Sequence, residues 1–391
     1  MKKILYLVGD EKFSREPFEP FSKQVCEFLN SFSIKLSKYK NINEYPDLKS
    51  LSFWCREKNI QRFKNTEKYL DFKIGLGLAF HITPSNIPTN FVYSLIFGLL
   101  SGNSNVIKVP TKKFKQIDII CKILKDLLLK FVFLKGKITI VKYQDNEKFT
   151  SELSYLCNAR IIWGGDKTIN SIRNHRIQER TVELSFADRY SFCIMNSKKV
   201  IQMSKFEINN LIQKFYNDSF AVDQNACSSP HLIVWIGKKS KEIEKKFWKK
   251  LYKFAKLKYN LQPFSSMEKF TNTCKYIIKQ DNIKSIQNFE NLIHKIEIKN
   301  LKTDNHQMRG KWGLFFEFYS KNLSNIKNII NNKYQTLTYY GVNKEELKKF
   351  LFKNNLKGID RIVPVGQSLD ISLNWDGYEI ISSLTRTIEV R

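Results

Sequence analysis

Residues 223–235, DQNACSSPHLIVW, place a cysteine among small polar residues immediately before an apolar run. A thiol on a loop can act as a nucleophile when positive charge or peptide dipoles stabilise its thiolate. Other cysteines lack this setting, since Cys26 and Cys121 fall on predicted apolar helix faces and Cys193 falls in a predicted strand. The same pattern also suits a small buried residue at the start of a strand. The residues around Cys227 therefore leave both interpretations open.

Residues 81–90, HITPSNIPTN, follow one predicted strand and precede a predicted helix. Pro84 and Pro88 each fix a φ angle and remove a backbone donor, so they make the loop stiff. Asn86 lies between them, at the carboxyl end of a strand, where open α/β folds bind ligands. Its amide can orient a ligand there, or it can satisfy its own turn.

Residues 99–115, LLSGNSNVIKVPTKKFK, contain a helix end followed by a strand. Gly102 stands where a residue that is free to adopt positive φ is needed to end the helix. The strand ends at Lys108, and Thr-Lys-Lys follows at 111–113. A lysine that leaves a strand at this edge suits a ribose or a phosphate, although an ordinary solvated lysine fits the pattern equally well.

Residues 161–173, IIWGGDKTINSIR, read as a strand, a Gly164–Gly165 turn and the start of a helix. Such a turn exposes backbone N–H groups at the helix amino end, which is a ready anion site. Asp166 is unfavourable beside a pyrophosphate and is predicted instead to cap the helix. The segment is neither a P-loop nor the standard dinucleotide-binding fingerprint.

The composition limits the classes of function. The chain has 391 residues with 66 Lys+Arg against 37 Asp+Glu, a net charge of +29. Such an excess attracts phosphates and nucleic acids. However, its densest run, at 238–258, carries apolar residues at helical spacing and so predicts a solvated helix face rather than a specific nucleic-acid surface. The seven cysteines contain no CxxC pair, so we expect no metal site, no disulfide framework and a reducing compartment.

The apolar stretches are short. The amino-terminal run is too short for the core of a signal peptide, and the longest stretch, FVYSLIFGLLSG at 91–102, is too short to span a membrane. We therefore expect a cytoplasmic protein with no membrane span.

Apolar runs rich in β-branched residues alternate with periodic helical segments. This rhythm predicts an α/β fold with parallel sheets and helical crossovers. The pattern restarts after residue 195, which predicts two α/β domains. The expected strands are 3–10, 73–82, 105–110, 137–143, 159–165, 189–195 and 231–237, and the expected helices are 18–38, 90–102, 118–131, 204–217 and 345–355.

The four polar segments, in this order, resemble the aldehyde dehydrogenase superfamily. They are more closely similar to the acyl-CoA reductases typified by the reductase subunit of the bacterial luminescence fatty-acid reductase complex, the LuxC family. The tail 358–386, GIDRIVPVGQSLDISLNWDGYEIISSLTR, is also similar, and the resemblance covers about residues 70–391. The tail residues in register are Arg361, Pro364, Gly366, Trp375, Asp376, Gly377 and Arg386.

The resemblance implies an aldehyde dehydrogenase-like fold of two α/β domains with a small oligomerisation arm, in a homo-oligomer. The expected domains are a nicotinamide cofactor-binding domain at 1–195, a catalytic domain at 196–360, and a segment at 361–391 that returns to the cofactor domain or the arm. An acyl-protein synthetase or transferase is an expected partner.

The resemblance also implies a reaction, in which an acyl thioester (acyl-CoA or acyl-protein) is reduced to an aldehyde. Cys227 would carry the acyl group, and Asn86 with the backbone N–H of Cys227 would form the oxyanion hole. The residues that would hold the cofactor are Thr83, Pro84, Lys108, Thr111, Gly164 and Gly165.

Two positions bear on the details of this reaction. Many oxidising relatives carry Glu-Leu-Gly-Gly with the glutamate as base, whereas this chain has Glu183 followed by Leu-Ser-Phe, so its role stays open. NAD-preferring relatives carry a glutamate at the position of Thr111. Without that negative charge, and with Lys112 and Lys113 beside it, the resemblance implies NADPH rather than NADH.

Three alternatives remain from the sequence. The chain could oxidise aldehydes to acids. It could be a thioesterase or acyltransferase that uses Cys227 with His231 or His81 as base and transfers no hydride. It could also be a binding protein that keeps the fold alone.

Overall fold

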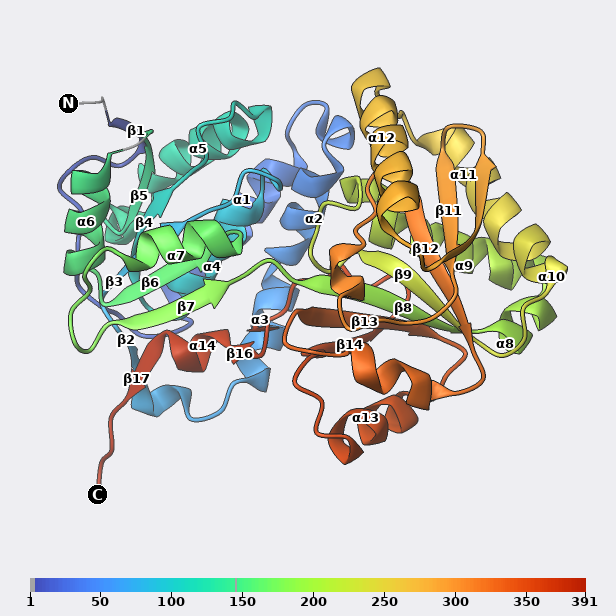
Figure 1. Ribbon diagram of the computed structural model, residues 1–391. Helices are drawn as coiled ribbons and strands as arrows, with labels where there is room; N and C mark the ends of the chain where they lie inside the picture. The colour runs from blue at the N-terminus through green and yellow to red at the C-terminus, as the bar shows by residue number, and fades with distance from the viewer. Residues whose placement is uncertain (1–3, 145) are drawn as a thin grey trace. The chain divides into compact units, whose positions relative to one another are not determined.

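The computed structural model describes residues 4–144 and 146–391. The chain forms two compact units, one from residues up to Ala187 together with Ser372–Arg391 and one from Asp188–Ile371 (Figure 1). They are called the first and the second unit below. The contacts thus divide the chain after residues 187 and 371, whereas the sequence placed boundaries after 195 and 360. Which unit binds a cofactor and which carries catalysis stays a prediction.

The first unit contains a six-stranded sheet in the order β1-β5-β4-β3-β6-β7. All neighbouring pairs are parallel except β1 with β5, where β1 forms an antiparallel edge. This sheet has the predicted parallel α/β character. In sheet order, the strands are β1 (Leu5–Val8), β5 (Ile138–Lys142), β4 (Ser104–Lys108), β3 (Leu78–Ile82), β6 (Ala159–Trp163) and β7 (Val182–Phe186).

Helical crossovers connect these strands. Helix α4 packs on β3 and β4, α5 on β1, α6 on β3 and α7 on β6. Helices α1, α2 and α3 precede the sheet, and α1 starts later than the sequence pattern suggested. The helices are α1 (Lys23–Ser37), α2 (Pro46–Trp54), α3 (Glu57–Thr66), α4 (Asn90–Leu100), α5 (Lys115–Leu128), α6 (Glu147–Leu156) and α7 (Asp166–Arg173).

Helix α4 is apolar on all sides and is buried along its whole length. A helix of this kind belongs in the interior of a domain rather than on its surface. Gly102 ends it with φ +80°, the positive value that the sequence predicted, and a Cβ there would lie 2.0 Å from the carbonyl oxygen of Phe18. The glycine is therefore required both by its conformation and by the close approach of another backbone.

The carboxyl-terminal segment belongs to the first unit. Strand β17 (Thr385–Thr387) pairs antiparallel with β2 (Lys73–Gly75). Before it come a hairpin of β15 (Asn374–Trp375) and β16 (Tyr378–Glu379) and the short helix α14 (Ile380–Ser383), which packs on α4. Asp376 and Gly377 make the hairpin turn with φ of +52° and +79°.

The second unit contains a seven-stranded sheet in the order β10-β11-β12-β9-β8-β13-β14. Its neighbouring strands are parallel except β10 with β11. In sheet order, the strands are β10 (Ile283–Phe289), β11 (Ile293–Ile298), β12 (Leu314–Ser320), β9 (Pro230–Ile236), β8 (Tyr190–Asn196), β13 (Tyr334–Tyr340) and β14 (Arg361–Pro364).

Both faces of this sheet are buried. Cys193 and Met195 of β8 point into one apolar cluster, while Phe192 and Ile194 point into the other. This alternation is expected of a central parallel strand that helices cover on both sides. The helices of this unit are α8 (Ser197–Gln202), α9 (Lys205–Ser219), α10 (Lys241–Ile243), α11 (Lys249–Lys258), α12 (Pro263–Lys279) and α13 (Lys344–Lys353).

The lysine-rich run at 238–258 is helical from Lys241 to Lys258, with one change of helix type. A single π-helical stretch, Glu244–Trp248, separates α10 from α11. Phe247 and Trp248 are fully buried in the second unit, whereas Lys249 and Lys253 are exposed. The run is therefore an amphipathic element with a solvated lysine face, as its spacing predicted.

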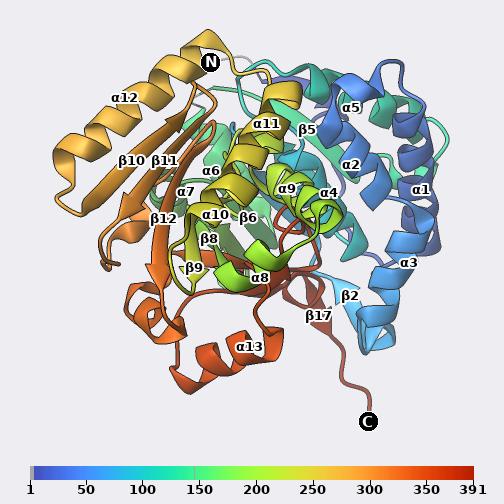
Figure 2. The same ribbon diagram turned by 90° about the vertical axis from the view of Figure 1, so that its right-hand side faces the viewer.

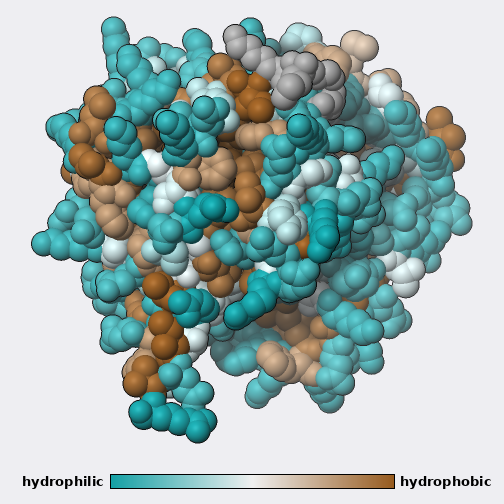
Figure 3. Space-filling view, turned by 90° about the vertical axis from the view of Figure 1, so that its left-hand side faces the viewer, coloured by the Kyte–Doolittle hydropathy of each residue, from teal (hydrophilic) through white to brown (hydrophobic). Residues whose placement is uncertain are grey.

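Figure 3 shows a face of the molecule on which hydrophilic residues predominate and apolar residues occur in separate small groups. Within residues 4–144 and 146–391, no helix combines the length and the apolar character needed to cross a membrane.

Candidate active site

Three of the segments singled out in the sequence lie on adjacent strands of the first unit. In the parallel register Ile82 of β3 pairs with Lys108 of β4 and with Ile162 of β6. The loop at 83–89, Lys108 and the Gly164–Gly165 turn therefore all follow strands at the carboxyl edge of one sheet. This is the edge at which open α/β sheets bind ligands.

Hydrogen bonds and a ring contact fix the position of Lys108. Thr83 donates twice to its carbonyl oxygen, from Oγ1 at 2.8 Å and from the backbone N–H at 3.2 Å. The Nζ atom lies 4.8 Å from the centroid of the Tyr143 ring, within range of a cation–π interaction. Because Tyr143 directly follows β5, the half-buried lysine is held over the ends of two neighbouring strands.

The Gly-Gly turn leads directly into α7. Gly165 is the N-cap residue and no side chain caps the helix, so the prediction that Asp166 acts as the cap is wrong, since Asp166 is already the first helical residue. A Cβ at Gly165 would meet no atom within 4 Å. The Cβ side of Gly165 is therefore open, and no side-chain cap occupies the amino end of α7, which suits an anion site there.

A series of buried hydrogen bonds connects β6, α4, β3 and β4 next to this edge of the sheet. Trp163 donates from Nε1 to Ser94 Oγ at 2.9 Å, and Ser94 Oγ lies 2.7 Å from His81 Nδ1. The other ring nitrogen, Nε2, lies 2.9 Å from Asn105 Oδ1. Asn105 Oδ1 can only accept, so Nε2 carries the hydrogen and donates to it, and in the neutral ring Nδ1 accepts from the Ser94 hydroxyl.

His81 is consequently a neutral, fully satisfied imidazole. Burial lowers its pKa to about 4, although the hydrogen bond with Asn105 acts in the opposite direction. Its side chain is fully buried within the first unit. His81 therefore links β3 to β4 through its hydrogen bond with Asn105, and it is a poor candidate for a general base.

The remaining candidate residues of this unit lie at its surface. Asn86 is exposed, between Pro84 and Pro88, which are half-buried. Thr111 and the two lysines after it are exposed just beyond the end of β4. Their side chains are accessible to a ligand, as their predicted roles require.

Cys227 lies in the second unit, on the loop between the 3-10 turn Phe220–Val222 and β9, and is half-buried. Two residues of this loop, Asp223 and Gln224, both have φ of +55°. The left-handed conformation costs roughly 1–2 kcal/mol for a residue other than glycine, so the surroundings must enforce it. Asn86 and Cys227 belong to different units, and their cooperation stays a prediction.

Gln224 and Ser191 enforce the conformation of this loop. Gln224 accepts from the backbone N–H of Gly313 at 2.8 Å and donates from Nε2 to the carbonyl oxygen of Leu314 at 3.2 Å. Ser191 donates from Oγ to the carbonyl oxygen of Cys227 at 2.6 Å and accepts from the N–H of Thr336 at 3.1 Å. The backbone of Cys227 is thus tied to β8.

The other cysteines differ from Cys227 in burial or position. Burial raises the pKa of Cys121 and Cys157 to about 12 and also raises the pKa values of Cys55 and Cys193. Cys26 and Cys274 are half-buried but lie within helices α1 and α12. Among the seven, all in the described part of the chain, Cys227 alone is both half-buried and outside a helix or strand.

Glu183 is held by two arginines of the first unit. Arg160 donates from Nε to its Oε2 at 2.9 Å, and Arg173 donates from Nε to its Oε1 at 2.7 Å. Burial alone would raise the pKa of Glu183, but the hydrogen bonds and charges of these arginines hold it below its ordinary value. A carboxylate so strongly stabilised is a weak proton acceptor, so its contacts favour a structural role.

His231 is a buried residue of the second unit. Its ring stacks on Tyr190 at a centroid distance of 5.3 Å. Burial, reinforced by the charge of Arg309, lowers its pKa to about 3. Neither His231 nor His81 therefore has the basicity that the thioesterase alternative asks of a general base near neutral pH.

The comparison with family models gives one match, to the model described as acyl-CoA reductase (LuxC), over residues 53–387. The chain belongs to this family. The resemblance inferred from the sequence is thereby confirmed. The family comprises NAD(P)-dependent oxidoreductases that act on the aldehyde group. No match was found among curated proteins.

Solved structures show the fold. Proline utilization A from Bradyrhizobium japonicum is 12% identical with a TM-score of 0.65, over 93% of this chain and 42% of that one. Aldehyde dehydrogenase 21 from Physcomitrella patens, in complex with the reaction product succinate, is 9% identical with a TM-score of 0.63, over 93% and 84%. The 1-pyrroline-5-carboxylate dehydrogenase of Thermus thermophilus is 10% identical with a TM-score of 0.63, over 94% and 81%.

This chain spans less than half the length of the proline utilization A chain that it matches. At such low identity the likeness concerns the fold alone, and it confirms the predicted aldehyde dehydrogenase-like α/β architecture.

Arg361, a tail residue that carries the LuxC resemblance, organises the loop at 365–371. It donates to the carbonyl oxygens of Ser368 at 3.0 Å and Asp370 at 2.8 Å. Asp218, at the end of α9, accepts from the N–H groups of Gly366 at 2.6 Å and Ser368 at 2.9 Å. The sequence reading missed Asp218. A carboxylate at a helix carboxyl end opposes the helix dipole, and that signal could have marked it.

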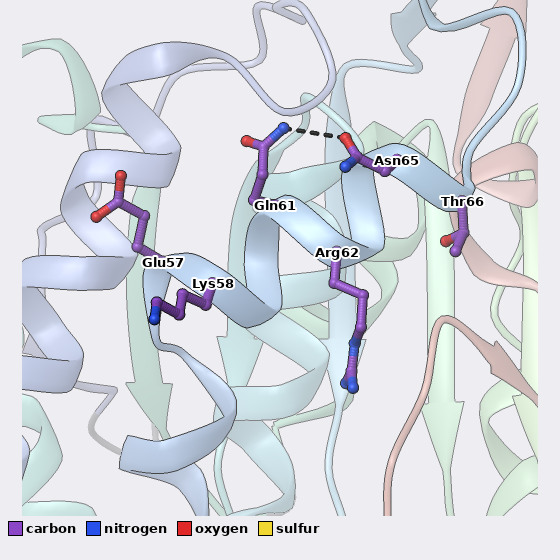
Figure 4. A pocket seen from close by; sticks show the side chains of 6 residues that line it. All are labelled: Glu57, Lys58, Gln61, Arg62, Asn65 and Thr66. Atoms are coloured by element: carbon purple, nitrogen blue, oxygen red, sulfur yellow. Dashed lines mark hydrogen bonds between the residues drawn. The ribbon is translucent and has the colours of Figure 1, made fainter.

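The structure also has a hollow away from these residues, shown in Figure 4. It measures about 660 Å³ and lies along α3, lined by Glu57, Lys58, Gln61, Arg62, Asn65 and Thr66. It shares no residue with the candidate site. In the described ranges, no three His, Cys, Asp or Glu side chains are grouped so as to hold a metal ion.

Proposed function

We propose that this chain reduces an acyl thioester, acyl-CoA or acyl-protein, to an aldehyde with NADPH, through a thioacyl-enzyme on Cys227. The second unit would carry the nucleophile and the first unit the cofactor. The observation that carries the proposal is the half-buried Cys227, on a loop fixed by Gln224 and Ser191, in a chain of the acyl-CoA reductase family. A homo-oligomer and a synthetase or transferase that delivers the acyl group belong to the same proposal.

The first step is acyl transfer. The Cys227 thiolate attacks the thioester carbonyl, a carbon–sulfur bond forms to Cys227, and the bond to the departing thiol breaks. The amide of Asn86 and the backbone N–H of Cys227 stabilise the oxyanion in between. Each donor of this kind typically contributes on the order of 100-fold in rate.

The carboxyl edge of the first unit fits a dinucleotide. Its donors are the ammonium group of Lys108 and the backbone N–H groups at the amino end of α7, while the Thr83 hydroxyl, which donates to the Lys108 carbonyl, can only accept a hydrogen bond from a ribose hydroxyl. Phosphates and ribose hydroxyls are the groups that such donors bind. When bound, NADPH supplies the hydride that reduces the acyl group, after which the Cys227 thiolate is released with the aldehyde.

The residues beyond β4 favour NADPH. Positions 111–113 offer a hydroxyl and two ammonium groups, all exposed, and no carboxylate. A carboxylate there would repel the 2′-phosphate of NADPH, whereas the lysines attract it.

The environment of the candidate bases supports reduction over the alternatives. A thioester is already activated, so attack by a thiolate requires no deprotonated water. Oxidation of an aldehyde to an acid and hydrolysis of a thioester both require a base that deprotonates a water molecule. Glu183 is paired with two arginines, and His81 and His231 are buried with strongly lowered pKa values.

The test is to incubate the protein with a panel of acyl-CoAs and NADPH while following nucleotide oxidation and trapping the aldehyde. Cys227→Ala should lose both signals, and Cys274→Ala, the same change at a half-buried helical cysteine, should keep them. Release of free acid without nucleotide consumption would instead indicate a thioesterase. Activity only in the direction of aldehyde oxidation would indicate an ordinary aldehyde dehydrogenase.

A further inference from the structure

Lys269 on α12 is a buried lysine of the second unit that the proposed reaction does not use. Its side chain is fully buried, and its ammonium group donates to the carbonyl oxygens of Asn291, of Leu292 at 3.0 Å and of Trp312 at 3.0 Å. An ammonium group has three N–H bonds, so these carbonyls match its donors in number. Burial lowers the pKa of Lys269 to about 7, whereas hydrogen bonds to these carbonyls favour the protonated form.

The carbonyl of Trp312 belongs to a segment that contacts the Cys227 loop. The N–H of Trp312 donates to the carbonyl oxygen of Asp223 at 3.2 Å, and the N–H of the next residue, Gly313, donates to Gln224 Oε1 at 2.8 Å. These two hydrogen bonds connect residues 312–313 to the two residues that start the loop. Cys227 follows Gln224 by three positions.

Both sides of this contact hold backbone conformations that need support. The φ angles are +55° at Asp223 and at Gln224, +53° at Trp312 and +89° at Gly313. Three of these four residues are not glycine. Strained backbone of this kind persists only where the surroundings over-determine it.

We propose that Lys269 is a positioning residue for the Cys227 loop. Its ammonium group holds the Trp312 carbonyl and so fixes the 312–313 segment, whose N–H groups clamp Asp223 and Gln224. The proposal rests on the proposed function for its meaning, because it assumes that the loop carries the nucleophile.

The surroundings of α12 are consistent with a fixed support. Figure 2 shows α12 lying beside β10 and β11. Lys269 binds the turn between these strands, and Thr273, one turn further along α12, lies with its Oγ1 2.9 Å from His294 Nδ1 of β11. A second contact holds the same loop, since Tyr259, which directly follows α11, donates to Asp223 Oδ1 at 2.5 Å.

Lys295 provides a matched control. It is also a buried lysine of the second unit, but its Nζ lies 2.9 Å from Glu317 Oε1 in the core. Glu317 in turn accepts from Trp235 and Trp248, at 3.1 and 3.0 Å. Removing Lys295 therefore disturbs a buried charge without removing a contact to residues 312–313.

The experiment compares Lys269→Met and Lys295→Met with the unaltered chain. Three quantities are measured: the rate of Cys227 alkylation by iodoacetamide, the rate of Cys227 acylation by acyl-CoA, and the midpoint of thermal unfolding. Lys269→Met should lower both Cys227 rates in the folded protein by about 10-fold or more, since small misplacements of reacting groups have effects of this size. Lys295→Met should lower the unfolding midpoint but leave both rates within about 2-fold, because the loop keeps its contacts.

Tyr259→Phe keeps the inference testable if Lys269→Met does not fold. It removes one hydrogen bond from the same loop and should slow both Cys227 reactions by about 3-fold or more, the equivalent of one ordinary hydrogen bond. Unchanged Cys227 rates in the folded Lys269→Met protein, or in Tyr259→Phe if Lys269→Met is unfolded, would overturn the proposal. Equal rate losses in Lys269→Met and Lys295→Met would overturn it as well.

Failure of the proposed function would look different. In that case Cys227→Ala would still form aldehyde, whereas the iodoacetamide rates of Lys269→Met and Lys295→Met would still decide whether Lys269 positions the loop.

Discussion

Thr83 donates a hydrogen bond from Oγ1 to the carbonyl oxygen of Lys108 at 2.8 Å, across the ends of two parallel strands. This contact joins the loop that carries Asn86 to the strand that presents Lys108. The proposed oxyanion donor and the proposed cofactor ligand are therefore held on one rigid edge of the first unit. Each can be tested separately.

Replacement of Asn86 by alanine should lower the maximal rate of acyl-CoA reduction. If its amide stabilises the oxyanion, we expect kcat to fall by about 100-fold with little change in KM, because the contact forms mainly in the transition state. Steady-state kinetics with NADPH measure this. Ser85→Ala, at the exposed neighbouring position, is the control and should stay near the unaltered rate. A rise in KM at constant kcat would instead indicate a role in ground-state binding.

Replacement of Thr111 by glutamate should change the nucleotide preference. A carboxylate beside the 2′-phosphate should lower kcat/KM for NADPH by about 10-fold or more, roughly 1.4 kcal/mol, and affect NADH much less. Thr271→Glu places the same new charge on the exposed surface of α12 and should leave both values unchanged. An equal loss for the two nucleotides would contradict the assignment of this segment to the 2′-phosphate.

Replacement of Glu183 by glutamine should destabilise the chain more than it slows the reaction. Arg160 is buried, with 2% of its side chain exposed, and would lose its charged partner. Removing one member of a buried pair costs about 3–5 kcal/mol, and the partial exposure of Glu183 places this pair at the lower end. Urea unfolding measures the loss, and Glu179→Gln, at an exposed ion pair, should change the stability much less.

The reaction itself distinguishes the roles of Glu183. The folded Glu183→Gln protein should retain at least about half of its acyl-CoA reduction rate, since a thiolate attack on a thioester needs no general base. Loss of activity at unchanged stability would assign the glutamate to catalysis.

Acidification should destabilise the fold through its buried histidines. The pKa values of His81 and His231 are lowered to about 4 and about 3, whereas an unfolded histidine titrates near its ordinary value of about 6.5. Below pH about 6.5 the unfolded chain therefore binds more protons than the folded chain, and stability falls as the pH decreases toward 4. The slope approaches about 1.4 kcal/mol per pH unit for each histidine.

Urea unfolding at pH 7 and pH 5 measures this effect. His231→Phe keeps an aromatic ring beside Tyr190 and should show a smaller loss of stability between the two pH values than the unaltered chain. An identical pH dependence in His231→Phe would contradict the lowered pKa of His231.

Much of the fold follows from local pattern. The apolar run at 90–100, the glycine after it and the β-branched run ending at Lys108 correspond to α4, Gly102 and β4. Strand direction does not follow from such patterns, because antiparallel β1 pairs with β5, a strand distant in the sequence. The sequence pattern likewise assigns β8 to the first half of the chain, although its partners in the sheet are β9 and β13.

The candidate site also contains residues that the local sequence pattern predicts and residues that it does not. Asn86, Lys108 and Gly165 could be predicted from the sequence because each lies at or just after the end of a strand, and the position of a residue in a strand–loop–helix unit is a local property. The supports of the site are not local. Gln224 accepts a hydrogen bond from a backbone N–H 89 positions away. Arg160 and Glu183 form their ion pair because β6 and β7 are neighbouring strands. Lys269 has no pattern that distinguishes it from the other lysines of the chain.

The most direct test of the central claim is the mass of the protein after mixing with acyl-CoA in the absence of nucleotide. We predict one acyl group per chain, located on the peptide that contains Cys227, which disappears on addition of NADPH with release of an equal amount of aldehyde. Cys227→Ala should acquire no acyl group, and Cys274→Ala should acquire a full one. An acyl group on a different residue, or NADPH-dependent aldehyde formation by Cys227→Ala, would contradict the account.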